Sequence, residues 1–325
     1  MKMNFEHLAK SARHLAGDHP KRADVILKES LHHDILYAIE QSELARDLVF
    51  QGGTALRLCY SSLRYSEDLD FVRGGNPLDA DKLRRFEEVL QAVAAERYGL
   101  SVRVKKPKKL LTENSTAVSV EVHRWTAVIE VPGKGERHPK IHIEVADVPA
   151  HDARPRTVTN PHGAAYGDAR PVLLNVSSEE EILADKIIAV AGRAHLKARD
   201  IWDIKWLTDR GIRLNLDLVR AKAVDYHLVE DSMVPLIGRL SSKLTEMAKP
   251  ETYAAFKQEL SRFLDQTEAR RWFDDDLRGQ SILMQAGEVV ERAIEGLKAP
   301  ASTHAQGTDT QQKLEAWRRR HAPNS

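Results

Sequence analysis

The sequence predicts an α+β fold, with a mixed β-sheet core flanked by helices and followed by a mainly helical C-terminal part. Three observations predict this fold. Short strand-like segments, several with apolar and polar residues in alternation, are confined to the first half of the chain. Segments with apolar residues three and four positions apart, typical of amphipathic helices, occur in both halves. The chain of 325 residues is long enough for one large or two modest domains.

The N-terminal part is predicted to begin with a polar, irregular stretch of twenty residues, followed by a helix with an apolar stripe. The stripe consists of Leu27, Leu31, Ile35 and Ile39. His32 and His33 lie on the same helix and are followed by Asp34. Because adjacent side chains point apart on a helix, we interpret these three as surface residues and not as a metal site.

The next part is predicted to alternate strands with helices. Turns are expected at residues 74–77 and 132–135, and a long surface loop rich in Pro, Gly and His is expected over residues 147–171. Apolar residues at helical spacing predict a helix over residues 81–98. Strands are predicted over residues 48–51, 66–71, 118–131 and 140–145.

The C-terminal part is predicted to be helical. Ser178 and Glu181 have the spacing of a capping box and predict a helix through Gly192. A second helix is predicted over residues 198–210, and further helices follow to about residue 297. The sequence thus suggests a sheet-containing core, a helical C-terminal domain and a flexible tail. Their predicted bounds are residues 1–170, 171–297 and 298–325.

The amino-acid composition indicates a cellular location but does not identify a function. The chain has 49 Lys and Arg against 48 Asp and Glu, so its net charge of +1 does not indicate a nucleic-acid partner. Basic clusters at residues 105–109 and 318–320 are either solvated surface or contacts for a phosphate backbone. Cys59 is the only cysteine, so no internal disulfide can form and a cytoplasmic location is expected. No apolar run is long enough to cross a membrane.

The most informative segment is a glycine turn followed by a pair of carboxylates. Gly52 and Gly53 separate a strand from a short helix, where backbone N–H groups without a neighbouring Cβ can approach phosphate oxygens. Asp68 and Asp70 lie two residues apart on the next strand, so both face one way. Two like charges on one face favour a divalent cation such as Mg²⁺ or Mn²⁺ between them. A phosphate-binding turn beside a metal-binding pair indicates nucleotidyl transfer.

These residues resemble the AbiEii family of nucleotidyltransferase toxins, within the DNA polymerase β-like nucleotidyltransferase superfamily. The resemblance rests on the segments Phe50-Gln51-Gly52-Gly53-Thr54-Ala55-Leu56-Arg57 and Ser66-Glu67-Asp68-Leu69-Asp70-Phe71. It continues in Glu181-Ile182-Leu183-Ala184-Asp185-Lys186 and Arg199-Asp200-Ile201-Trp202-Asp203-Ile204. It covers roughly residues 27–207 and implies the nucleotidyltransferase type of mixed sheet. Thr54 replaces the serine of many members and keeps the hydroxyl.

The resemblance also implies roles for later residues. Lys186 is expected to bind the nucleotide's phosphates, and one or both of Asp200 and Asp203 are expected to belong to the site. A third carboxylate, acting as a base or a second metal ligand, is expected from a later strand. Glu144 is the best-placed candidate and Glu121 the competitor.

Two arginines leave alternatives open. Arg57 lies one turn into the short helix, so it either contacts triphosphate oxygens or pairs with Asp68. Arg199 precedes Asp203 by four residues and is in position for a salt bridge on the helix surface.

The leading hypothesis is a Mg²⁺-dependent nucleotidyltransferase that transfers NMP from an NTP, with the tRNA 3′ end as the expected acceptor. The resemblance implies a toxin of a type IV toxin–antitoxin or abortive-infection system, and hence a cognate antitoxin as a partner. Modification of a protein or an antibiotic remains open within the enzyme class. A catalytically silent nucleotide-binding module is the hypothesis from another class, against which the intact Gly52, Gly53, Asp68 and Asp70 argue.

Overall fold

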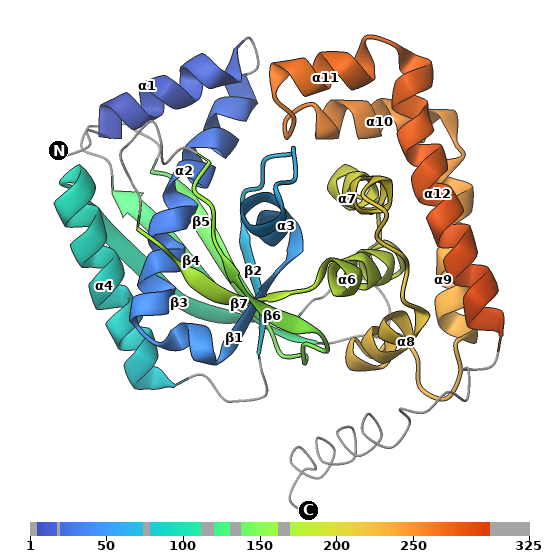
Figure 1. Cartoon of the computed structure of the whole chain (residues 1–325), viewed down its shortest axis with the longest axis horizontal. Coiled ribbons are helices and arrows are strands. Elements are labelled where there is room, and N and C mark those ends of the chain that lie inside the picture. Colours follow the sequence, from blue (N-terminus) through green and yellow to red (C-terminus); the bar gives the residue numbers. More distant parts are fainter. Residues whose placement is uncertain are drawn as a thin grey trace, which may run out of the picture.

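A computed structural model describes residues 5–17, 20–73, 79–111, 120–130, 138–161 and 170–299. It has one mixed seven-stranded sheet with helices on both sides, which confirms the predicted α+β class (Figure 1). The strands are β1 (Leu48–Gln51), β2 (Leu69–Arg73), β3 (Ser101–Leu111), β4 (Glu121–Glu130), β5 (Lys140–Ala146), β6 (Ala153–Thr157) and β7 (Leu173–Ser177).

The sheet order β3-β4-β5-β2-β1-β7-β6 places the two most informative strands at its centre. β1 pairs antiparallel with β2 and parallel with β7, whereas β2 pairs parallel with β5. In this register Gln51, Asp70 and Glu144 are aligned across three neighbouring strands. Residues aligned in this way share one face of a sheet, so the sheet itself brings Asp70 and Glu144 together.

The helices form two groups around this sheet. In Figure 1, α1, α2 and α4 lie on the left of the molecule, α3 stands above β1 and β2, and α6 to α12 occupy the right. The first group is α1 (Phe5–Ala16), α2 (Pro20–Gln41), the short 3₁₀ helix η1 (Leu44–Arg46), α3 (Gly52–Tyr60) and α4 (Ala80–Tyr98). The second group is α6 (Glu179–Gly192), α7 (Ala198–Asp209), α8 (Leu216–Asp225), α9 (Val234–Met247), α10 (Pro250–Leu260), α11 (Gln266–Phe273) and α12 (Asp276–Lys298).

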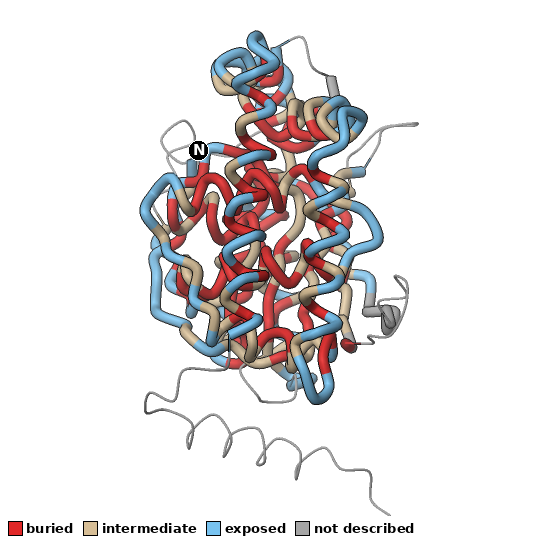
Figure 2. Tube along the Cα trace, turned by 90° about the vertical axis from the view of Figure 1, so that its right-hand side faces the viewer, coloured by how far each residue is buried: buried red, intermediate tan, exposed pale blue. Residues whose placement is uncertain are grey.

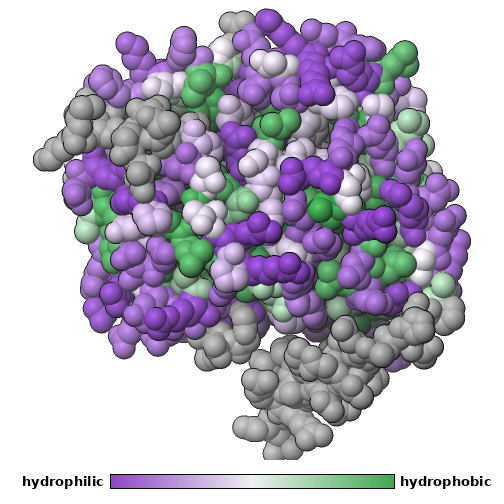
Figure 3. Space-filling view, viewed as in Figure 1, coloured by the Kyte–Doolittle hydropathy of each residue, from purple (hydrophilic) through white to green (hydrophobic). Residues whose placement is uncertain are grey.

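Both faces of the central strands are packed. Phe50 and Phe71 lie on one face, with their ring centroids 5.1 Å apart, in the main hydrophobic core. Val49 and Val72 lie on the other face in a smaller cluster, against which Tyr226 packs. The buried segments fill the interior of the molecule in Figure 2, and the face in Figure 3 is largely hydrophilic with dispersed apolar patches. Burial of this apolar surface is the dominant stabilising contribution to the fold.

The start of the chain differs from the prediction. The first described residues form the amphipathic helix α1, which buries Phe5, Leu8, Ala12 and Ala16 along one side. The prediction that His32, His33 and Asp34 are surface residues was also wrong, because α2 is covered by neighbouring elements and all three are buried. Asp34 forms ion pairs with Arg97 and Arg170. A helix that receives partners on several sides cannot be divided into inside and outside by one apolar stripe.

Three strands were missed in the sequence, for physical reasons. β3 and β6 are the two edges of the sheet, where lysine, arginine and proline are tolerated because one side of the strand has no partner. β3 contains the basic run 105–109, and β6, which lies inside the predicted surface loop, is exposed along its whole length. β7 is short but alternates, burying Leu174 and Val176. Because β7 starts at residue 173, the sheet extends past the predicted domain boundary at residue 170, and the division into domains stays a prediction.

The other predicted elements are placed close to their expected bounds. The strand predicted over 118–131 begins at Glu121, the helix predicted over 81–98 is α4, and the helix predicted over 198–210 is α7. The turns at 74–77 and 132–135 and nearly all of the predicted tail lie outside the described residues. Within the described part of the chain, no helix combines the length and the apolar character that crossing a bilayer requires.

The capping box at the start of α6 is half formed. The Ser178 hydroxyl accepts a hydrogen bond from the backbone N–H of Glu181 at 3.1 Å, as predicted. The Glu181 carboxylate turns instead to the backbone N–H groups of His151 and Asp152, and it pairs with the buried Lys222 at 2.6 Å. Lys222 lowers the pKa of Glu181, against the effect of burial. Glu181 therefore ties α6 to the segment that precedes β6.

Candidate active site

The glycine turn and the carboxylate strand are in direct contact. Gly52 has φ of +77°, a conformation that favours glycine, and a Cβ at this position would lie 2.6 Å from Oδ2 of Asp70. α3 begins directly at Gly52, so its unpaired N-terminal N–H groups lie at the same end of the strands as the carboxylates. The structure thus brings together the two features that the sequence predicted to act on a nucleotide.

Asp68 and Asp70 flank Leu69, the first residue of β2, whose side chain is fully buried in the main core. The Thr54 hydroxyl donates a hydrogen bond of 2.5 Å to the backbone carbonyl of Asp68. Burial, Glu144 and Asp68 together raise the pKa of Asp70 to about 7, and Lys186 and Arg199 offset only part of this effect. A cation bound beside Asp70 would lower this raised pKa, because its positive charge favours the ionised carboxylate.

Glu144 is the predicted third carboxylate that the sheet aligns with Asp70. It is half-buried, and its Oε1 accepts a hydrogen bond of 2.7 Å from Nε of Arg124 on the adjacent strand. Glu121 is the first residue of β4, and the pairing of β4 with β5 begins only at the next residue, Val122. The structure therefore places Glu144, and not Glu121, beside Asp70.

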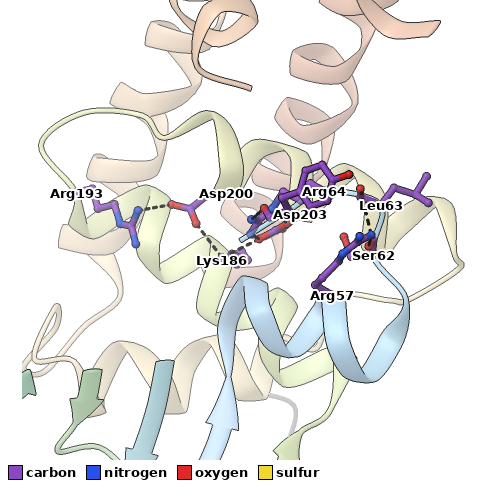
Figure 4. A network of polar contacts seen from close by, with 9 residues as sticks. Arg57, Ser62, Leu63, Arg64, Lys186, Arg193, Asp200 and Asp203 are labelled. Atoms are coloured by element: carbon purple, nitrogen blue, oxygen red, sulfur yellow. Dashed lines mark hydrogen bonds and ion pairs between the residues drawn. The ribbon is translucent and has the colours of Figure 1, made fainter. Parts of the chain in front are cut away.

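The predicted residues of the later helices form a buried cluster (Figure 4). Nζ of Lys186, on α6, lies 3.0 Å from Oδ1 of Asp200 and 2.9 Å from Oδ2 of Asp203. The two aspartates are three residues apart on α7 and so share one side of the helix. Burial alone would lower the pKa of Lys186, but Asp203 and Asp200 outweigh it and raise that pKa.

Two arginines that the sequence did not indicate complete this cluster. Arg193, which follows α6, pairs with Asp200 at 2.9 Å. Arg64 binds Asp203 through two hydrogen bonds of 2.6 Å each, and its side chain is 2 % exposed. Burial alone would raise the pKa of Asp203, but Arg64 and Lys186 lower it. Three cations thus face two carboxylates, which leaves one positive charge in excess.

Arg64 also connects the cluster to the glycine turn. A Cβ on Gly53 would lie 1.9 Å from Nη2 of Arg64, so the guanidinium occupies the space that glycine leaves free. The predicted pair between Arg199 and Asp203 is wrong, because Asp203 is bound by Arg64 and Lys186 and the Arg199 guanidinium lies over the Phe263 ring. No local pattern could have found Arg64, since it precedes its partner by 139 residues.

Arg57 has a structural partner. Its guanidinium pairs with Glu29 of α2 at 3.1 Å and donates to the carbonyl of Ser62 at 2.9 Å. It also lies over the Tyr65 ring, 5.0 Å from the centroid. Of the two alternatives for Arg57, the pair with Asp68 is wrong, and its contact with the triphosphate stays a prediction.

The carboxylates fit a magnesium-like ion as a partial ligand set. Within the described ranges, no group of three or more His, Cys, Asp or Glu residues is arranged to hold a metal. Glu144 is paired with Arg124, so the protein supplies at most two metal ligands here, Asp68 and Asp70. Mg²⁺ bound to nucleotides is commonly held by one or two carboxylates, with phosphate oxygens and waters completing its coordination. The raised pKa of Asp70 fits this arrangement.

The contact between Gly53 and Arg64 predicts a strong coupling between two substitutions. We expect Gly53→Ala to destabilise the wild-type protein by about 2 kcal/mol or more, because the new methyl group displaces a buried, paired guanidinium. In an Arg64→Ala background the same change should cost far less, since the clashing side chain is gone. Urea unfolding of the two single variants and the double variant measures this coupling.

Gly238 of α9 offers a matched control. A Cβ there meets no atom within 4 Å, so Gly238→Ala should be neutral or stabilising by up to about 1 kcal/mol, as expected for a helix interior. Equal costs of Gly53→Ala in both backgrounds would contradict the contact.

Two solved structures are similar to this chain. The structure of MenT4, nucleotidyltransferase toxin Rv2826c from Mycobacterium tuberculosis H37Rv, is similar with a TM-score of 0.49 and 18% identity, over 89% of this chain and 98% of that one. JHP933 from Helicobacter pylori is similar with a TM-score of 0.46 and 16% identity, over 90% and 97% of the two chains. No curated protein is detectably similar in sequence.

The family model described as the nucleotidyl transferase AbiEii toxin of a type IV toxin–antitoxin system matches residues 34–276, more than half of the chain. The matched range contains the glycine turn, the carboxylate strand, Lys186 and the two aspartates of α7. This chain is therefore a nucleotidyltransferase of the AbiEii toxin family, the toxin component of type IV toxin–antitoxin systems.

Proposed function

We propose that this toxin transfers NMP from an NTP to the 3′ end of a tRNA, in a reaction that depends on Mg²⁺ or Mn²⁺. The observation that carries the proposal is the contact between the Gly52 turn and Asp70, because backbone N–H groups suited to phosphate oxygens lie beside a carboxylate suited to a divalent metal. The mixture of cations and carboxylates around Lys186 adjoins this turn through Arg64 and supports binding of a highly charged ligand.

Each part of the site has a proposed role. The N–H groups of the turn and of the start of α3 bind triphosphate oxygens, and Asp68 and Asp70 hold the divalent ion. That ion supplies neutralisation of the negative charge on the phosphates. Lys186, held between Asp200 and Asp203, presents its ammonium to the same phosphates. A type IV toxin also implies a cognate antitoxin as a partner.

The proposed transfer step uses Glu144 as the base. The acceptor hydroxyl oxygen attacks the α-phosphorus, its proton passes to Glu144, and the bond to the departing pyrophosphate breaks. The hydrogen bond from Arg124 orients the Glu144 carboxylate on the side of the sheet that also carries Asp70. The exposed Arg103 and Lys105 on the outer strand β3 support an RNA acceptor, because basic side chains bind its phosphate backbone.

A transfer assay tests the proposal. Purified protein is incubated with each α-labelled NTP, Mg²⁺ or Mn²⁺, and in turn total RNA, cell protein or an aminoglycoside. We expect label at the 3′ end of tRNA, and we expect Asp68→Asn to reduce the rate by about 100-fold or more because a ligand of the ion is lost. Glu88→Gln, an exposed change on α4, is the control and should leave the rate unchanged.

The other outcomes are informative. Label on protein or on the aminoglycoside would replace the proposed acceptor and keep the transfer chemistry. Transfer that is unaffected by Asp68→Asn would overturn the proposed site. Growth inhibition that survives this substitution, with no label on any acceptor, would favour a binding module instead of an enzyme.

A further inference from the structure

Two polar residues of α2 contact the segment that leads into the carboxylate strand, and a third contacts α3. Nε2 of His32 lies 3.1 Å from the backbone carbonyl oxygen of Glu67, the residue before Asp68. Nζ of Lys28 pairs with the Glu67 side chain at 3.1 Å, and Glu29 pairs with Arg57. Lys28 and His32 are four residues apart and therefore share one side of the helix. α2 thus contacts Glu67, directly before Asp68, whereas α7, on the other side of α3 in Figure 1, contacts Arg64.

The surroundings of His32 define its protonation state and its tautomer. The side chain is completely buried, and burial lowers the pKa of His32. The imidazole is therefore neutral near pH 7 and carries a single N–H. Since a carbonyl oxygen can only accept, that proton is on Nε2 and is donated to Glu67. Nδ1 is buried and has no hydrogen-bond partner among the residues that the structure describes. An apolar side chain would fill this space without leaving a buried nitrogen unpaired, so packing alone does not account for histidine here.

The bond from His32 is one of two that hold Asp68. Glu67 C=O belongs to the peptide group before the Asp68 Cα atom, and Asp68 C=O belongs to the peptide group after it. His32 donates to the first of these carbonyls and Thr54 donates to the second. Fixing both peptide planes fixes the backbone dihedral angles of Asp68, and with them the direction of its Cα–Cβ bond.

We infer that His32 is a positioning residue that aims the Asp68 carboxylate at its cation, acting through the Glu67 carbonyl and together with Thr54. The inference rests on the proposed role of Asp68 as a metal ligand. His32 and its neighbours Lys28 and Glu29 precede the matched range 34–276, so the family match does not assign this role. Groups that orient metal ligands typically change metal affinity by about tenfold or more when removed.

The test compares His32→Leu with His32→Gln in the full chain. Leu removes the donor, whereas the side-chain amide of Gln places an N–H donor at a similar reach. Mn²⁺ binding without nucleotide is measured by isothermal titration, together with the Mg²⁺ concentration that gives half-maximal transfer. We expect His32→Leu to weaken Mn²⁺ binding about tenfold and to raise the Mg²⁺ requirement similarly, and His32→Gln to remain within about threefold of wild type.

Controls separate positioning from stability. Ser30→Ala removes a buried hydroxyl of α2 that donates to the Ile26 carbonyl of its own helix, and it should leave Mn²⁺ binding unchanged. If His32→Leu fails to fold, the bond from Thr54 to the Asp68 carbonyl is tested instead. We expect Thr54→Val, which lacks the hydroxyl, to weaken Mn²⁺ binding about tenfold, and Thr54→Ser, which keeps it, to remain within about threefold of wild type. Equal losses of thermal stability in His32→Leu and His32→Gln with unchanged Mn²⁺ affinity in both would overturn the inference.

The test also separates this inference from the proposed function. If Mn²⁺ binding is lost in Asp68→Asn but is unaffected by His32→Leu and by Thr54→Val, the metal site stands and the positioning role fails. If Asp68→Asn itself leaves Mn²⁺ binding unchanged, the proposed metal site fails, and the role of His32 fails with it.

Discussion

Asp70→Asn is expected to make the metal-free protein more stable while it removes transfer activity. The pKa of Asp70 is raised from 3.8 to about 7 by burial and by Glu144 and Asp68, so the folded protein is destabilised whenever this carboxyl is ionised. Each pKa unit corresponds to about 1.4 kcal/mol, which sets an upper limit near 4 kcal/mol. Because Asp70 keeps some contact with solvent, we expect a gain of about 1 to 3 kcal/mol.

The pH dependence of this gain follows from the direction of the shift. Below about pH 4 the carboxyl is protonated in both the folded and the unfolded chain, so Asp70→Asn should change stability little there. The gain should grow between pH 4 and pH 7 and stay constant above the folded pKa of about 7. Urea unfolding at a series of pH values without divalent ions measures it.

A matched control separates this effect from a general effect of removing charge. Asp81→Asn changes an exposed carboxylate on α4, and its effect on unfolding should stay within about 0.5 kcal/mol. Added Mg²⁺ should stabilise the wild-type protein more than Asp70→Asn, because the variant has lost a ligand. Lower stability of Asp70→Asn at pH 8 would contradict the repulsion between the carboxylates.

Arg64→Met is expected to be among the most destabilising single substitutions in this protein. Arg64 and Asp203 are almost completely buried and joined by two hydrogen bonds of 2.6 Å. Removal of the arginine leaves Asp203 with Lys186 as its remaining cation in a site from which water is excluded. Breaking a buried ion pair on one side typically costs about 3 to 5 kcal/mol, because the remaining charge stays buried.

Two further variants test this explanation. Arg64→Met combined with Asp203→Leu should recover much of the lost stability, since replacing both members of a buried pair with apolar residues is often neutral. Arg84→Met removes an arginine of an exposed pair with Glu88 and should cost at most about 1 kcal/mol. A cost for Arg64→Met no larger than that for Arg84→Met, measured by urea unfolding, would contradict the buried pair.

Much of the candidate site could be predicted because its signals are local. Each signal is a short spacing within one element: two adjacent glycines in a turn, two carboxylates two residues apart at a strand, and Asp200 and Asp203 three residues apart on a helix. Alternation along residues 140–145 identified Glu144 as a candidate in the same way. The central strands β1, β2 and β5 were predicted because each has an apolar face that is buried in the core. The edge strands β3 and β6 were missed because they lack that apolar pattern.

The sequence by itself determined the family and the sheet-forming centre, and it predicted a metal-binding role for the carboxylate pair, since these depend on residue type and on short spacings. The tertiary structure decided which charges meet: Arg64 with Asp203, Arg57 with Glu29, and His32 with the Glu67 carbonyl. Each of these contacts joins residues separated by 28 or more positions. Long polar side chains can reach several partners, and burial against particular neighbours, which only the folded chain specifies, selects one of them.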